Sequence, residues 1–337
     1  MKNPILSIRD LHVEYKVYGG RLKVLNGIDL DIYPGEKVGL VGESGCGKTT
    51  TMRTVLRVLP KQGVVTQGTV VFQGKSVLNM RGKELQELRG MGISMIFQDP
   101  TASLNPVFTV GEQIIDTIKY SGMMKGEKDK NKKVNEHAIK SLQDCALPDV
   151  ERIMKSYPFQ LSGGMRQRVC ISMALATQSF LIADEPTTNL DVTIQDQVLH
   201  LIRKLVEEKG TSLILITHSL GVAQEMTDRI CVMYAGNVVE VAPTKRLFEN
   251  PCHPYTQGLL KSVPRLFGKG IMEGIPGRIS SYLNPPKGCR FHPRCEKVLS
   301  ICQEKRPPLV EMEEGHCVAC YLYGQDQMQL SKEKEVE

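Results

Sequence analysis

Residues Gly42 to Thr49, in the sequence GESGCGKT, combine the groups that a phosphate-binding loop needs. They fit the pattern G-x-x-x-x-G-K-[ST], follow an apolar run typical of a strand, and precede a segment with helical periodicity. Glycines let backbone N–H groups converge on phosphate oxygens, and the N-terminus of the next helix adds partial positive charge. Lys48 would bridge the β- and γ-phosphates, and Thr49 would give its hydroxyl to Mg²⁺. The loop therefore predicts a site for a nucleoside triphosphate.

Two consecutive carboxylates extend this site towards hydrolysis. The apolar run FLIADEP predicts a fully buried strand that ends at Asp184. A carboxylate at that position can hold Mg²⁺ through water. Glu185 follows directly and is well placed to accept a proton from an attacking water molecule. The combination predicts hydrolysis of the bound nucleotide.

The stretch LSGGMRQR, from Leu161 to Arg168, precedes a predicted helix and resembles the signature motif of ABC-type ATPases. In that family the serine and glycines, here Ser162, Gly163 and Gly164, form a second phosphate cradle at a helix start. This cradle reads the γ-phosphate bound to the opposing subunit. The resemblance implies an α/β fold, a P-loop NTPase of the ABC ATPase type. Such a fold has a RecA-like core, an antiparallel β subdomain and a helical signature subdomain, here with a small C-terminal extension.

Further positions match the family in order. Gln98 in FQDP matches the loop glutamine that senses Mg²⁺ and water, Asp191 in TTNLD matches the D-loop, and His218 in LITHS matches the switch histidine at the γ-phosphate. The family stacks adenine on an aromatic ring; Tyr15 is the match preferred here, with Tyr18 as the alternative. The resemblance implies nucleotide contacts from Tyr15, Gly42, Ser44, Gly45, Gly47, Lys48, Thr49, Thr50, Ser162, Gly163 and Gly164, catalysis by Glu185, His218, Lys48 and Gln98, and Mg²⁺ held by Thr49, Gln98 and Asp184.

The segments SMIFQDPTASLNPVFTVGEQI, LFENPCHPYTQGLLKSVP and IPGRISSYLNPPKGCRFHPRC resemble the dipeptide/oligopeptide importer branch. This resemblance implies an ATPase that powers peptide import at the cytoplasmic face of the cell membrane. Its partners would be two membrane permease subunits, a second, paralogous ATP-binding subunit and, indirectly, an extracellular solute-binding protein, with no nucleic acid. A nickel or oligosaccharide importer is the first alternative. A soluble ABC ATPase acting on nucleic acid or ribosomes, and an exporter ATPase, are alternatives of other classes.

Five of the ten cysteines lie between residues 289 and 320. The chain has no signal-peptide h-region and no apolar run near the ~18 residues of a membrane span, so a reducing compartment is expected and metal binding is favoured over disulfides. Cys289, Cys295 and Cys302 lack the C-x₂-C spacing common in zinc sites. The importer resemblance implies a [4Fe–4S] cluster on these three and Cys320, which fits the pattern His-x-x-x-Cys through His316. Cys317 as fourth ligand, zinc, and simple packing of thiols remain alternatives.

The length of 337 residues predicts more than one structural unit. The resemblance divides the chain into a nucleotide-binding domain at 4–242, with its helical subdomain at about 100–168, and an extension at 243–323. The charged tail at 324–337 is expected to be disordered. The net charge of +6 comes partly from the run Lys125–Lys133, which predicts a solvated loop. Local patterns also predict a helix after the phosphate loop that stops at Pro60, and a hairpin that turns at Gly236–Asn237.

Overall fold

The computed structural model describes residues 3–127, 129–177, 179–188, 190–262 and 274–323, and the chain forms two compact units. Unit 1 consists of Met1–Pro4, Ile32–Lys37 and Ser76–Ile216, and unit 2 of Ile5–Asp31, Val38–Lys75 and Thr217–Glu337. Each unit therefore joins segments that are far apart in the sequence.

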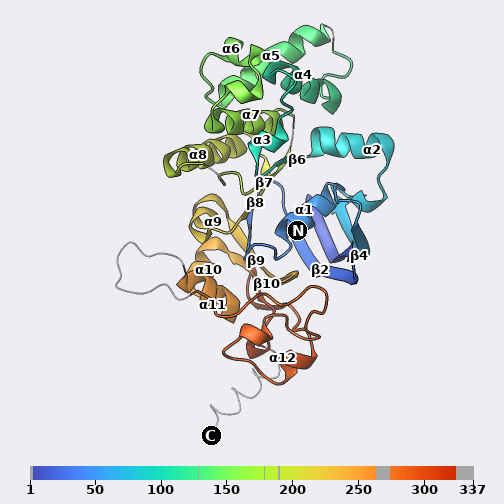
Figure 1. The fold of residues 1–337 in the computed structure, drawn as a ribbon, viewed down its shortest axis with the longest axis vertical. Helices are drawn as coiled ribbons and strands as arrows, with labels where there is room; N and C mark the ends of the chain where they lie inside the picture. The colour runs from blue at the N-terminus through green and yellow to red at the C-terminus, as the bar shows by residue number, and fades with distance from the viewer. Residues whose placement is uncertain (1–2, 128, 178, 189, 263–273, 324–337) are drawn as a thin grey trace. The chain divides into compact units, whose positions relative to one another are not determined.

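Unit 1 combines parallel strands with a group of helices (Figure 1). Its strands lie in the order β8-β7-β6, and both neighbouring pairs are parallel. Every residue of β7 and β8 is buried, as their continuous apolar sequences predict for a sheet covered on both faces. The elements are α2 (Gly82–Glu87), β6 (Ile93–Ile96), α3 (Pro100–Ser103), α4 (Val110–Ser121), α5 (Lys130–Asp144), α6 (Val150–Lys155), α7 (Gly163–Leu175), β7 (Phe180–Asp184), α8 (Val192–Lys209) and β8 (Ser212–Thr217).

Local sequence signals explain where the helices of unit 1 begin and end. Thr109 and Glu112 form a reciprocal capping box at the start of α4, and Gly122 ends that helix in the left-handed conformation. Helices α4, α5, α6 and α7 lie together in unit 1, where α4 and α5 each contact the other three (Figure 1). The last of them, α7, continues to Leu175.

Unit 2 contains two groups of strands. The first is the antiparallel sheet β2-β1-β4-β5, in which β1 pairs antiparallel with β4. In the second, β3 runs parallel to β9, which forms a hairpin with β10, and β12 adds to the far side of β10. The elements are β1 (Leu6–Val17), β2 (Gly20–Ile32), β3 (Lys37–Val41), α1 (Lys48–Val55), β4 (Gly63–Phe72), β5 (Lys75–Ser76), α9 (Leu220–Met226), β9 (Arg229–Tyr234), β10 (Asn237–Pro243), α10 (Thr244–Glu249), α11 (Pro254–Lys261), α12 (Ile301–Glu304), β11 (Val310–Glu313) and β12 (His316–Val318).

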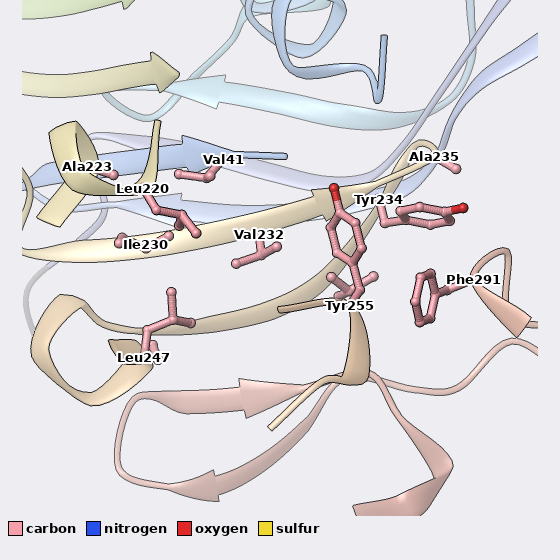
Figure 2. Close-up of a cluster of buried hydrophobic side chains, with 12 residues drawn as sticks. Val41, Leu220, Ala223, Ile230, Val232, Tyr234, Ala235, Leu247, Tyr255 and Phe291 are labelled. Atoms are coloured by element: carbon pink, nitrogen blue, oxygen red, sulfur yellow. The ribbon is translucent and has the colours of Figure 1, made fainter. Parts of the chain in front are cut away.

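The core of unit 2 includes side chains from the C-terminal extension. Tyr255 and Phe291 are almost fully buried and pack with Tyr234 of β9 in one cluster (Figure 2). The edge-to-face ring contacts have centroid distances of 4.7 Å for Tyr234–Tyr255 and 5.0 Å for Tyr234–Phe291. The extension and the β9–β10 hairpin therefore share a core and lie in the same compact unit.

Three local predictions were wrong in detail. Helix α1 ends at Val55, before Pro60, because Arg57 adopts a left-handed conformation (φ 54°) and the N–H groups of Arg57 and Val58 bond back to Thr54 and Arg53. The hairpin turns one residue earlier than predicted, with Ala235 and Gly236 both at positive φ. The described residues of the charged run are exposed as predicted, but from Lys130 the run forms the first turn of α5.

The tail expected to be disordered lies outside the described residues. No helix in the described part of the chain is both long enough and apolar enough to span a membrane.

Candidate nucleotide-binding and hydrolysis site

The predicted phosphate loop connects β3 to α1 in unit 2, and its glycines meet steric needs. Gly42 has φ 157°, and a Cβ atom there would lie 2.2 Å from the carbonyl oxygen of Met233. Gly47 has φ 108° at the start of α1, and a Cβ there would lie 2.7 Å from Leu25 Cδ2. Both backbone conformations and both close approaches exclude larger residues. The loop is thus held tightly against β2 and β9.

The lysine of the loop is buried and hydrogen-bonded to the loop itself. Lys48 is 5% exposed, and its Nζ donates to the carbonyl oxygens of Gly42 at 2.6 Å and Glu43 at 3.1 Å. This places the ammonium group inside the curve of the loop, where it can meet phosphate oxygens. The Tyr15 hydroxyl lies 3.4 Å from Thr50 Oγ1, whereas Tyr18 is fully exposed. Tyr15 is therefore the tyrosine that contacts the loop's helix.

In unit 1 the structure brings Gln98 and Glu185 together. Gln98 Nε2 and Thr188 Oγ1 both donate to Glu185 Oε2, each at 3.0 Å. Glu185 has a left-handed backbone (φ 46°), which costs about 1–3 kcal/mol for a residue with a side chain, while its N–H donates to Ile216. The strained backbone and the two donors orient the carboxylate. Asp184 lies at the end of β7 and is buried.

The signature residues form the start of α7, also in unit 1. Ser162 is the N-cap, and its hydroxyl accepts a hydrogen bond from the Met165 N–H at 3.3 Å. Gly163 and Gly164 are the first helical residues, so their N–H groups belong to the helix end that attracts anions. Gln167 in this helix is buried and donates to the Pro186 carbonyl oxygen at 2.7 Å. The signature helix is therefore hydrogen-bonded to Pro186, the residue that follows Glu185.

His218 is exposed and lies in unit 2, directly after β8. The next residue, Ser219, caps α9 by accepting from the Val222 N–H. The predicted nucleotide residues are thus divided between the units. Tyr15, the phosphate loop and His218 belong to unit 2, whereas Gln98, Asp184, Glu185 and the signature residues belong to unit 1.

The five thiols of the cysteine-rich segment are buried or partly buried. Burial raises the pKa of Cys320 to about 12, with further contributions from Cys289, Cys295 and Cys302. Burial likewise raises the pKa of Cys289 to about 11, with Cys302 and Cys295 contributing. The pKa of Cys317 is raised by burial and by Glu311, and the other thiols do not contribute to it.

The strand β12 explains why Cys317 differs. Successive side chains of a strand point to opposite faces, and His316 and Val318 are buried while Cys317 is only partly buried. His316 Nε2 donates a hydrogen bond of 2.8 Å to a carboxylate oxygen of Glu240, which is fully buried. Glu240, His316 and Cys252 form a compact group, but the Glu240 oxygens already accept from the N–H groups of Cys252 and His253. We therefore assign a structural role to this group and not a role in metal binding.

Sequence reasoning missed several contacts of the site. Thr188 helps to orient Glu185, and the phosphate loop is contacted by Tyr255, Tyr282 and Arg294 of the extension. One signal was available for Arg294, because an acidic residue at Glu43 inside a loop meant for phosphate calls for a cation beside it. Nothing local pointed to the two tyrosines.

Comparisons with known proteins agree with this geometry. Residues 25–188 match the family described as ABC transporter, and residues 239–302 match the oligopeptide/dipeptide transporter C-terminal region. The ATP-binding cassette MJ0796, solved as a dimer with ADP and phosphate, aligns with a TM-score of 0.63 and 27% identity over 71% of this chain and 98% of that chain. The phosphate loop, the paired carboxylates and the signature helix define an ATPase of the ATP-binding cassette class.

Curated relatives narrow the class. The dipeptide transport ATP-binding protein DppD of Bacillus subtilis is 42% identical over 324 residues, which cover 95% of each chain. The oligopeptide transport ATP-binding protein OppD of the same organism is 41% identical over 326 residues, covering 96% of this chain and 90% of that one. The chain belongs to the family of dipeptide/oligopeptide-type ABC transporter ATP-binding proteins, and it is an ATPase that works on ATP with Mg²⁺.

Proposed function

We propose that this ATPase powers the import of di- or oligopeptides through a partner membrane permease. The observation that carries the proposal is the extent of the similarity. It runs through the C-terminal region at 239–302 as well as through the ATPase core, and it covers nearly the whole chain. A nickel or oligosaccharide importer would use the same ATPase chemistry with another cargo.

In this proposal Lys48 and the N–H groups of the phosphate loop bind the β- and γ-phosphates. Thr49, Gln98 and Asp184 would hold Mg²⁺, which would supply positive charge to offset the charge that develops on the phosphates. Glu185, oriented by Gln98 and Thr188, accepts the proton of the attacking water. His218 contributes at the γ-phosphate, and Tyr15 supplies the ring against adenine.

The test of cargo is uptake by cells in which the gene is deleted and replaced by wild type or Glu185→Gln. Labelled dipeptides, labelled oligopeptides, nickel and an oligosaccharide are supplied in parallel. Peptide uptake that returns with wild type and not with Glu185→Gln supports the proposal. Restoration of nickel or sugar uptake alone, or normal peptide uptake in the deleted strain, contradicts it.

An exposed apolar group in unit 1 supports a permease partner. Val107 and Phe108 lie before α4, and Tyr157 and Phe159 lie before α7. The Val110 N–H donates to the Ser156 carbonyl oxygen at 2.9 Å, so the two loops are neighbours. Together these four residues form the apolar loop pair, and the rings of Tyr157 and Phe159 stack at 5.6 Å. Exposed apolar groups of this kind mark protein contacts.

Copurification with the permease tests this surface. Phe159→Glu is expected to release the chain from the permease, because a carboxylate in an apolar contact loses its hydration. Tyr120→Glu is the matched control, since Tyr120 is as exposed as Phe159 (70% and 68%) but lies at the far end of α4. Equal retention of both variants would exclude the apolar loop pair as the docking surface.

The partner set also includes a second ATP-binding subunit, identical or paralogous, whose signature residues face this chain's phosphate loop. A solute-binding protein would deliver the cargo to the permeases from outside. Peripheral attachment at the cytoplasmic face of the cell membrane follows from these contacts. If the chain were instead a soluble ATPase that acts on nucleic acid, RNA or DNA would copurify with it and the permease would not.

We propose further that Cys289, Cys295, Cys302 and Cys320 hold a [4Fe–4S] cluster, which requires four thiolates. The thiols of Cys289, Cys295 and Cys302 contribute to the raised pKa of Cys320, whereas no thiol contributes to that of Cys317, which supports this set over one with Cys317. Burial disfavours the thiolate form, and a cationic cluster would offset that cost. Zinc is the alternative metal. Iron and sulfide analysis after anaerobic purification distinguishes the two, with Cys320→Ser expected to lose the metal and Cys317→Ser to keep it; the reverse pattern would refute the ligand set.

A further inference from the structure

We propose that Arg294 is a positioning residue for ATP, and that the C-terminal extension holds the phosphate loop in its binding conformation. Arg294 Nη1 donates to Glu43 Oε2 at 2.8 Å, and Nη2 donates to Glu43 Oε1 at 3.1 Å. This bidentate pair joins the extension to the second residue of the loop. The Arg294 side chain is 4% exposed, so the pair is shielded from water and salt on its cationic side.

The rest of the guanidinium is fixed by the extension and by β9. Its Nε donates to the Pro276 carbonyl oxygen at 2.8 Å, and Nη2 also donates to the Ile275 carbonyl oxygen at 2.9 Å. Nη1 lies 3.4 Å from the Tyr234 hydroxyl. All three nitrogen atoms are therefore engaged, and the planar group has one orientation. A guanidinium held in this way presents a fixed partner to Glu43.

Two tyrosines hold the backbone of the same loop. The Glu43 N–H donates to the Tyr255 hydroxyl at 2.9 Å, and the Tyr282 hydroxyl donates to the Gly45 carbonyl oxygen at 2.7 Å. Tyr255 is itself locked by packing against Tyr234 and Phe291 (Figure 2). The extension thus contacts residues 43 to 45 through one side chain and two backbone groups.

These contacts lie next to the groups that bind phosphate. Lys48 Nζ donates to the carbonyl oxygen of Glu43, the residue that Arg294 and Tyr255 hold. If Glu43 shifts, the lysine loses a contact that places its ammonium group. Because phosphate binding needs several N–H groups to converge at once, a looser loop must be ordered again each time ATP binds. The extension removes that cost in advance.

The cysteine-rich segment contains Arg294 and a second arginine, Arg290, each next to a cysteine. Arg294 directly precedes Cys295, and Arg290 directly follows Cys289. Arg290 Nη1 donates to the carbonyl oxygens of Lys23 at 3.0 Å and Ala235 at 2.5 Å. Whatever fixes these two cysteines also fixes the arginines beside them. This last step rests on the proposed metal site, whereas the role of Arg294 does not.

The first experiment measures the affinity of the full chain for a fluorescent ATP analogue with Mg²⁺. Arg294→Gln is expected to weaken binding roughly 10-fold, the size of one lost charge-assisted hydrogen bond. Arg294→Lys keeps the charge without the fork and should recover part of the loss. Arg306→Gln is the control, because Arg306 is an exposed arginine of the extension whose Nη2 donates to the Gly27 carbonyl oxygen at 2.7 Å, away from the loop.

A double-mutant cycle separates positioning from a general loss of stability. Glu43→Gln should weaken binding, and adding Arg294→Gln should cause little further loss, because both changes break the same contact. In the assembled transporter the KM for ATP should rise while kcat is largely kept. Additive losses in the cycle, equal losses in Arg294→Gln and Arg306→Gln, or wild-type affinity in Arg294→Gln would each overturn the proposal.

Hydrogen exchange tests the link to the cysteines without any measurement of activity. The N–H groups of residues 42–48 are expected to exchange faster in Arg294→Gln and in Cys295→Ser than in wild type or Cys317→Ser. Unchanged exchange in Cys295→Ser would overturn the cysteine link alone. A failure of peptide uptake would leave these binding and exchange results untouched, so the two proposals can fail separately.

Discussion

Acid should weaken unit 2 through the buried side chain of His253. This side chain is 1% exposed, and its Nδ1 accepts a hydrogen bond from the Tyr255 N–H at 3.0 Å, which requires an unprotonated nitrogen. Burial lowers its pKa from 6.5 to about 3. The folded state therefore binds the proton less readily than the unfolded chain. The contribution of the neutral His253 side chain to stability is complete above the unfolded pKa. It is lost as the pH falls from there towards the folded pKa.

The size of the effect follows from the two pKa values. About pH 5 is some 1.5 units below the unfolded pKa and well above the folded one. At that pH, protonation of His253 in the unfolded chain lowers the free energy of unfolding by about 2 kcal/mol relative to neutral pH. That is a large share of the stability of an ordinary domain. Since His253 caps the helix that carries Tyr255, the phosphate loop should lose its contact with Tyr255 in the same pH range.

The assay is urea unfolding of wild type, His253→Gln and His200→Gln between neutral pH and about pH 5. A glutamine can accept from the Tyr255 N–H without titrating, so His253→Gln should lose about 2 kcal/mol less than wild type on acidification. His200 has a side chain that is 64% exposed, and its replacement should leave the wild-type pH dependence unchanged. Parallel pH curves for wild type and His253→Gln would refute the reasoning.

Three further predictions concern the nucleotide site. Glu185→Gln should lower ATP turnover roughly 10²–10⁴-fold with ATP binding retained, as measured by turnover and nucleotide binding in the assembled transporter; near wild-type turnover would remove Glu185 from its role as the base. Gly42→Ala should abolish ATP binding, because its Cβ would lie 2.2 Å from the Met233 carbonyl oxygen; Gly74→Ala, with open space around its Cβ, tests whether a glycine change alone matters, and equal binding by both variants would contradict the steric argument. The isolated chain should hydrolyse ATP slowly and with a rate per chain that rises with concentration, since a complete site needs a second signature helix; fast hydrolysis independent of concentration would argue against this.

The parts of the fold that the sequence predicted well share a strong local cause. The apolar strands β7 and β8 and the phosphate loop follow from runs of residues whose burial or backbone conformation admits few alternatives. The end of α1 could not be predicted from the sequence. It depends on the left-handed conformation of Arg57, which an arginine seldom adopts. The hairpin turn was misplaced by one residue because Ala235, rather than Asn237, has positive φ beside Gly236.

The candidate site shows the same division. Gln98 and Glu185 were each predicted from their own motifs, and the structure adds the hydrogen bond between them. The preference for Cys320 over Cys317 came from a resemblance and stays a prediction; the structure adds that Cys317 lies on the less buried face of β12. The acidic Glu43 indicated that a cation would lie nearby, but no local pattern could identify Arg294, which is 251 positions away and is brought close only by the tertiary fold.

The pairing of Glu43 with Arg294 has a consequence for how the chain acquires its activity during synthesis. The two residues are 251 positions apart. At roughly 5–20 residues per second, a ribosome needs about 10 to 50 seconds between them. All segments of unit 1 precede residue 217, so that unit can complete its core while the last segment of unit 2 is still being made. Throughout that interval the nascent phosphate loop lacks the arginine and tyrosines that shape it. The order of translation therefore delays ATP binding until the cysteine-rich segment has emerged, so a chain truncated before Arg294 should be released as a poor ATP binder that cannot compete with full-length subunits for nucleotide.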